Sequence, residues 1–172
     1  MANELYTRTN QKLYFAGLAL DAWRVAEAAQ ALNAQTQIQA AREGALFHLY
    51  GAVLGLCHEI AGYYRLPQAG LPQVEQLLTR EVLATAPSPE LAELVELAQQ
   101  RESWLGQLLT AYQQLFEPPR EEKRAKVDPA LIVAVSVGGQ EEKTELGLDS
   151  LVDWQLRIRQ LAARFREGMS EW

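Results

Sequence analysis

Apolar residues recur every three or four positions through the first third of the chain, and this spacing predicts two long helices. The first covers residues 4–31, where leucines and closely spaced alanines repeat. The second starts at Thr36, because Gln39 three residues later completes a capping box. It is expected to run to about Tyr64, since Pro67 disfavours helix in the residues just before it.

The middle of the chain predicts a turn and two further helices. Residues 66–73 (LPQAGLPQ) contain two prolines and are typical of a turn, and a short third helix is expected over residues 72–85. Residues 87–90 (PSPE) place a serine directly before a proline, which favours a helix start. The fourth helix then extends to Phe116. Its apolar stripe is interrupted at residues 101–102, which could mark a polar contact or a pocket.

The last third of the chain changes in composition. Residues 117–129 (EPPREEKRAKVDP) read as a charged, proline-flanked connector. Residues 130–137 (ALIVAVSV) are β-like, and a small β-hairpin is expected near residues 130–147. A final helix begins near Ser150 and carries its apolar residues on one face.

These elements predict an all-α fold in one helical-bundle domain over residues 1–172. Helices with apolar stripes and short links bury those stripes most simply against one another, so we expect an antiparallel bundle of four to five helices. The hairpin near residues 130–147 would be an appendage at one end.

The most apolar stretch, GALFHLYGAVLGLCHEI (residues 44–60), is expected to be core rather than a membrane span. Only 14 residues without a formal charge separate Glu43 from His58, whereas a span needs roughly 20. On a helical wheel, its bulky residues share one side, and its glycines share the other with His48 and Glu59. The small side predicts a close approach by the alanine-rich first helix, although a cleft there remains an alternative.

Composition narrows the function classes. The net charge of −6 argues against a general nucleic-acid binder, which usually has a basic excess. The single cysteine, Cys57, cannot form an internal disulfide, so a reducing, cytoplasmic location is expected. The first residues lack the basic and apolar segments of a secretory signal. We therefore expect no nucleic-acid partner and no membrane association.

Metal and thiol chemistry are not predicted. His58 and Glu59 begin an H-E-x-x-H pattern, but its second histidine would have to be residue 62, which is Gly62. The chain has two histidines, and neither has a glutamate three residues before it, as di-iron bundles require. Cys57 lies on the bulky side of its helix, which favours a buried structural thiol. We expect no metal and no cofactor.

Arg42 and His48 resemble the R-x4–6-H element of the HEPN helical ribonucleases, which are also small bundles. That resemblance implies RNA cleavage with both residues in the active site. Residues six positions apart on a regular helix point about 120° apart, however, so the two side chains should not converge. The alternative is an arginine near a helix start and a histidine at the edge of the core.

Residues 145–161 (ELGLDSLVDWQLRIRQL) resemble the LGxDSL signature of acyl and peptidyl carrier domains. That resemblance implies phosphopantetheine on Ser150, at a helix N-terminus suited to a phosphodiester. Carrier domains need further helices after this one, yet 22 residues follow Ser150. The alternative is that Asp149 or Ser150 caps the last helix. A carrier-like or small-ligand-binding role that uses Ser150 therefore stays an alternative function.

The last helix carries four arginines, which could dock an acidic partner or could form a solvated face. Those residues are Arg157, Arg159, Arg164 and Arg166. The opening ELYTRTNQKLYFAGLAL and the closing helix resemble an uncharacterised family of small helical proteobacterial proteins, which implies a cytoplasmic bundle. The leading hypothesis is a non-enzymatic bundle without catalytic residues, which acts through a protein partner or as a homodimer.

Overall fold

The computed structural model describes residues 2–118 and 146–170, and all secondary structure in these ranges is helical. Three helices are long, and four are short. The long ones are α1 (Ala2–Ala29), α2 (Ala34–Tyr63) and α7 (Leu148–Ser170). The short ones are α3 (Val74–Leu77), α4 (Arg80–Thr85), α5 (Pro89–Gln99) and α6 (Trp104–Gln114).

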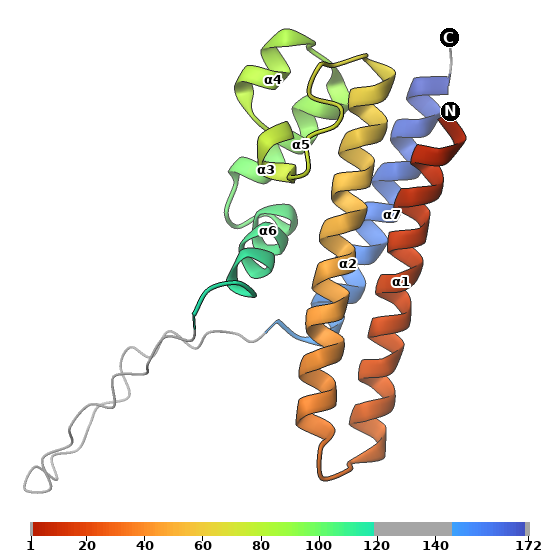
Figure 1. Cartoon of the computed structure of the whole chain (residues 1–172), viewed down its shortest axis with the longest axis vertical. Helices are drawn as coiled ribbons and strands as arrows, with labels where there is room; N and C mark the ends of the chain where they lie inside the picture. The colour runs from red at the N-terminus through yellow and green to blue at the C-terminus, as the bar shows by residue number, and fades with distance from the viewer. Residues whose placement is uncertain (1, 119–145, 171–172) are drawn as a thin grey trace, which may run out of the picture.

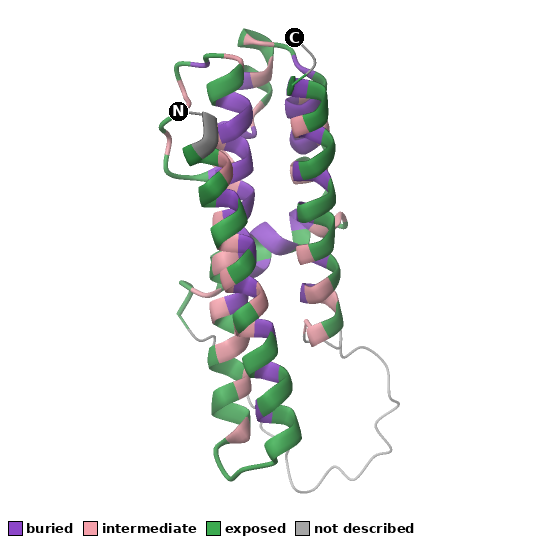
Figure 2. Ribbon diagram, turned by 90° about the vertical axis from the view of Figure 1, so that its right-hand side faces the viewer, coloured by how far each residue is buried: buried purple, intermediate pink, exposed green. Residues whose placement is uncertain are grey.

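The three long helices lie side by side, α3, α5 and α6 pack against α2, and α4 packs against α5 (Figure 1). α1 and α2 form an antiparallel hairpin, whose turn begins at Gln30 in the left-handed region (φ 47°). α7 packs against both helices of the hairpin, and its last turn lies near the first turn of α1. The far end of the hairpin extends beyond α6 and α7 in both ribbon views (Figures 1 and 2).

Three of the five predicted helices have the expected course, with ends that differ by about two residues. α1 ends at Ala29, and α2 starts at Ala34 after Asn33 rather than at a Thr36 capping box. The predicted start at PSPE is confirmed, because Ser88 accepts a hydrogen bond from the Leu91 N–H (3.3 Å). The last helix begins at Leu148, two residues earlier than expected.

The other two predicted helices are each divided. The third becomes α3 and α4, with the Thr79 side chain accepting a hydrogen bond from Val82 N–H at the start of α4. The fourth becomes α5 and α6, so the interruption at residues 101–102 is a turn. Ser103 caps α6 by accepting from Gly106 N–H (2.9 Å). A Cβ at Gly106 would lie 2.2 Å from the Gln100 carbonyl oxygen, so glycine makes this corner possible.

The predicted β-hairpin near residues 130–147 is not confirmed. Residues 130–145 lie outside the described residues, as does most of the connector at residues 117–129. The two residues of that segment that the structure does describe, Leu146 and Gly147, are in neither helix nor strand. They lead directly into α7.

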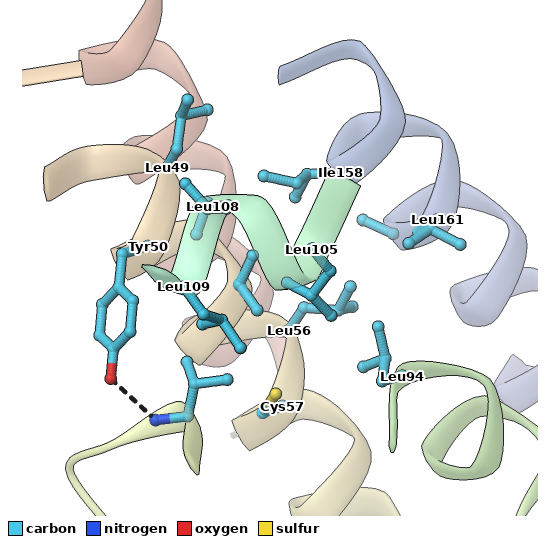
Figure 3. Packing of buried hydrophobic residues seen from close by; sticks show 14 of the residues in the cluster. Leu49, Tyr50, Leu56, Cys57, Leu94, Leu105, Leu108, Leu109, Ile158 and Leu161 are labelled. Carbon is cyan, nitrogen blue, oxygen red and sulfur yellow. Dashed lines mark hydrogen bonds between the residues drawn. The ribbon is translucent and has the colours of Figure 1, made fainter. Parts of the chain in front are cut away.

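The core lies between the three long helices and the short helices, and Figure 3 shows the part of it around Leu56 of α2, Leu105 of α6 and Ile158 of α7. Tyr50 is also buried here, and its hydroxyl accepts from Val74 N–H (3.0 Å) and donates to Glu75 (2.8 Å). The predicted bulky face of α2 is confirmed, because all of its residues are buried: Leu46, Leu49, Val53, Leu56, Cys57 and Ile60.

The opposite, small face of α2 packs against α1, as the glycines predict. A Cβ on Gly55 would lie 2.6 Å from Thr9 Oγ1, and one on Gly51 would lie 3.1 Å from the side chain of Lys12. At Gly55 a side chain would collide with Thr9, so glycine allows α1 and α2 to approach closely there. α2 is also long and apolar enough to be a candidate membrane span, but most of its apolar window is buried in the fold, as in core helices of soluble proteins.

Candidate functional site

The structure brings Arg42 and His48 no closer than a regular helix does. α2 is continuous from residue 34 to residue 63, so the two side chains point about 120° apart. The His48 ring instead lies edge-on to Phe15 and Phe47, with centroid distances of 5.3 and 5.4 Å. This arrangement does not favour the ribonuclease interpretation of the pair.

Burial first, and then the nearby charges of Lys12 and Arg8, lower the pKa of His48. The ring therefore lies close to two cations, and its Nδ1 is buried without a hydrogen-bond partner among the described residues. A positive imidazole would be repelled at this position, so the neutral form is favoured. The electrostatic surroundings of His48 are thus set by the first helix rather than by Arg42.

Ser150 lies inside the first turn of α7 rather than at its cap, because the helix begins at Leu148. Its N–H donates to the Gly147 carbonyl (3.2 Å), and its side chain is partly exposed. It lines a hollow that also contains Arg101 and Glu102. The serine of the carrier signature precedes its helix, and the position of Ser150 in this chain differs from that arrangement.

Cys57 is buried in the core, and His58 is held by a hydrogen bond to the backbone. Burial raises the pKa of the Cys57 thiol to about 12, and the residue is 2% exposed. His58 Nε2 lies 2.8 Å from the Leu71 carbonyl oxygen, to which it donates. Within residues 2–118 and 146–170, no group of three or more acidic, histidine or cysteine side chains could hold a metal ion.

Two of the four arginines on α7 form ion pairs at the surface. Arg157 contacts Asp153 one turn earlier (2.6 Å), and Arg164 donates two hydrogen bonds to Glu93 of α5 (2.9 and 2.6 Å). Arg159 is exposed. Because their charges are balanced within the fold, Arg157 and Arg164 do not favour a basic docking surface for an acidic partner.

The fourth arginine forms a buried pair that no sequence pattern predicts. Arg166 donates two hydrogen bonds to Glu59 (both 2.8 Å), whose side chain is fully buried, and a third to Asn10 (3.0 Å). The guanidinium also lies 4.6 Å from the centre of the Tyr6 ring. The pair joins α1, α2 and α7, and leaves the Glu59 carboxylate fully engaged.

The outer face of α1 is the clearest candidate for an interaction surface. α1 buries one side against its neighbours, and a second apolar stripe lies on the opposite side, facing solvent. We call this second stripe the outer stripe and define it by four residues, with their exposed fractions: Tyr14 (64%), Leu18 (50%), Val25 (67%) and, just beyond the helix, Leu32 (111%). Because large exposed apolar patches are typical of interaction sites, the outer stripe is a candidate for one.

The spacing of the outer stripe is that of a coiled-coil seam. Leu18 and Val25 are seven residues apart, and Tyr14 precedes Leu18 by four. Asp21 lies between them on the same track and pairs with Arg24 (2.7 Å). The signal was present in the sequence, but the alanine and leucine pattern of the core-facing side dominated the interpretation of residues 4–31.

A second feature missed by sequence reasoning is a hollow where α1, α2 and α6 meet. Arg8 and Lys12 of α1 line it together with the aromatic rings of Phe47 and Tyr112. Arg8 and Lys12 are one helical turn apart, and no carboxylate lies between them in the sequence. This spacing is a sequence signal for two cations on one face of the helix. The aromatic partners come from distant helices, and only the fold brings them there.

Comparison with known proteins finds one family. A model of a family of unknown function, DUF6586, matches residues 1–172, the whole chain. No curated protein and no solved structure matches. The comparisons therefore identify a family and assign no activity to it.

Proposed function

We propose that this chain, which belongs to the family of unknown function DUF6586, is a non-catalytic helical protein that pairs with a second copy of itself through the outer stripe of α1. The observation that supports this proposal is the presence of apolar residues on both sides of α1. A helix that packs on one side only normally carries polar residues on the other. Tyr14, Leu18 and Val25 occupy that other side here.

An antiparallel arrangement of two α1 helices gives the best match of the stripe with itself. In antiparallel coiled coils, the two apolar tracks of the heptad face each other. With the twofold axis near residue 23, Leu18 of one copy lies opposite Ala28 of the other. The same register brings Asp21 level with Val25 of the second copy and next to its Arg24. Asp21 of each copy then lies next to Arg24 of the other copy. The small side chain of Ala28 lets the two helices approach closely.

Several wider expectations belong to the same proposal. We place the protein in one domain, in a reducing cytoplasm, without nucleic-acid or membrane partners. The net charge of −6 and the burial of the single thiol, Cys57, support these assignments. A self-complementary surface also favours a second copy over an unrelated partner, because a twofold contact uses the same patch twice.

Sedimentation equilibrium on the purified protein tests the proposal. Wild type is expected to be a dimer at micromolar concentrations, and Leu18→Asp is expected to be a monomer, because it would place two carboxylates in an apolar contact. Leu156→Asp on α7 is the matched control, since Leu156 is 51% exposed and Leu18 is 50% exposed. A monomeric wild type, or a Leu18→Asp variant that still dimerises, overturns the proposal.

The charge register has its own test in the same experiment. Asp21→Lys and Arg24→Glu should each weaken the dimer, and the two changes combined should restore part of the loss because the pair is reversed. Equal dimerisation by all three variants would contradict the antiparallel register.

A further inference from the structure

The hollow between α1, α2 and α6 combines positive charge with exposed aromatic rings in an acidic protein. It has a volume of about 310 Å³ and adjoins a second hollow of about 550 Å³, with which it shares Tyr50, Pro72 and Tyr112. Its position, on the side of α2 covered by α6 and the segment before α3, is separate from the outer stripe. We call it the α1–α2–α6 hollow.

The two cations of this hollow have no ion-pair partner in the described part of the chain. Arg8 donates to the Gln11 side chain (3.1 Å), and Glu4, the nearest carboxylate before it in the sequence, forms no salt bridge with it. Burial first, and then the charge of Arg8, lower the pKa of Lys12. By contrast, Arg157, Arg164 and Arg166 each have a carboxylate within 3 Å.

Lys12 is held in position by its surroundings. Its aliphatic chain crosses Gly51, where a Cβ would come within 3.1 Å of it, and its ammonium group lies 5.2 Å from the centre of the Phe47 ring. The glycine provides the space, and the ring attracts the cation through its π electrons. A side chain fixed in this way loses little further entropy when it binds an anion.

Aromatic rings line the same hollow and continue into the second hollow. Tyr50 and Tyr112 stack with a centroid distance of 3.8 Å, and Tyr112 contacts Phe47 at 6.4 Å and Phe116 at 5.2 Å. Phe47 and Phe116 are 48% and 69% exposed. Such rings favour offset or edge-to-face contact with another planar ring.

We propose that the α1–α2–α6 hollow binds a small organic anion in which a phosphate or carboxylate group is attached to a planar ring. Arg8 and Lys12 bind the anionic group, and the ring packs against Phe47 and Tyr112. His58, also part of the hollow, donates its Nε2–H to the Leu71 carbonyl, which fixes the orientation of its ring. No bond is made or broken, so the site is a binding site and its occupancy is the measurable property.

Isothermal titration calorimetry with phenyl phosphate and with benzoate tests this inference on the chain of residues 1–172. Saturable binding of either probe is expected, and the tighter of the two identifies the anionic group. Inorganic phosphate has the anionic group without the ring, and phenol has the ring without the anionic group. Each should bind more weakly than phenyl phosphate. No saturable binding of either ring anion, or equal affinity for inorganic phosphate and phenyl phosphate, overturns the proposal.

Variants distinguish this hollow from the rest of the surface. Arg8→Gln and Lys12→Gln should each weaken binding about tenfold or more, the loss typical of a hydrogen bond to a charged group. Arg157→Gln is the matched control, because it removes an exposed arginine on α7 and should leave the affinity unchanged. Far-UV circular dichroism checks that each variant is folded. Unchanged affinity in both the Arg8 and the Lys12 variant contradicts the assignment of the site.

Discussion

Two glycines on the same helix should respond in opposite ways to the same substitution. A Cβ on Gly55 would lie 2.6 Å from Thr9 Oγ1 and 3.2 Å from Thr9 Cα, on a residue with no exposed surface. A Cβ on Gly44 would meet only the Ala19 side chain, at 3.8 Å, which is ordinary van der Waals contact. Both glycines lie inside α2, so the backbone contribution of the substitution is the same at each.

The size of the difference follows from two opposing effects. Alanine in place of glycine favours helix by about 1 kcal/mol at either position. At Gly44 nothing opposes that gain, so Gly44→Ala should raise the free energy of unfolding. At Gly55 the added methyl group forces α1 away from α2, and overpacking of this kind costs about 1–3 kcal/mol. The two variants should therefore differ by about 1–3 kcal/mol, with Gly55→Ala the less stable.

Urea unfolding followed by far-UV circular dichroism measures this difference. All variants are compared at one protein concentration, because self-association would add to the apparent stability. Thr9→Ala removes the oxygen at 2.6 Å, so the double variant with Gly55→Ala should recover part of the loss. If Gly55→Ala is as stable as Gly44→Ala, the close crossing of α1 and α2 does not have the geometry described.

Two further predictions concern the buried charges and the thiol. Arg166→Ala should cost about 3–5 kcal/mol of unfolding free energy because it leaves the Glu59 carboxylate buried without a partner. Arg164→Ala, which breaks an exposed pair with Glu93, should cost less than about 1 kcal/mol, and equal losses in urea titrations would contradict the distinction. Iodoacetamide should modify Cys57 at pH 8 only after urea unfolding, because burial raises the thiol pKa to about 12. Rapid modification of the native protein, followed by mass spectrometry, would show that the thiol is accessible.

Hydrophobic periodicity predicted the long helices and the buried face of α2 because both depend on local spacing. The bulky residues of α2 repeat with the helical period, so they share one face of the helix. That face is buried in the core regardless of which residues of the other helices pack against it. The cap at Ser88 was also predictable, because its side chain bonds to a backbone group three residues away. Information of this kind lies within one or two turns of the chain.

The predicted fourth helix is divided at the turn between α5 and α6, and contacts between the two helix ends stabilise this turn. Ser103 accepts from Gly106 N–H and donates to the Leu97 carbonyl, so one hydroxyl ends α5 and begins α6. Gly106 then lets the Gln100 carbonyl approach closely. The apolar spacing on either side continues as if the helix were unbroken. The sequence therefore shows a gap in the apolar stripe at residues 101–102 but does not indicate that the helix ends there.

The partners of charged residues could not be read from the sequence. Glu59 and Arg166 are separated by 107 positions, and each taken alone is compatible with a solvated helix face. The same applies to the cations of the α1–α2–α6 hollow, because Tyr112 lines this hollow with them only through the placement of α6. Pairings between distant elements are a property of the packed fold, and periodicity within one helix contains no information about them.

The two proposed contacts use different sides of α1, which allows each to control for the other. Leu18 lies on the outer stripe, whereas Lys12, less than two turns away, belongs to the hollow on the α2 side. Leu18→Asp should therefore abolish dimerisation and leave the affinity for phenyl phosphate unchanged, and Lys12→Gln should do the reverse. A loss of both properties in either folded variant would mean that the two surfaces are coupled through α1, and the assumption that they are independent would be wrong.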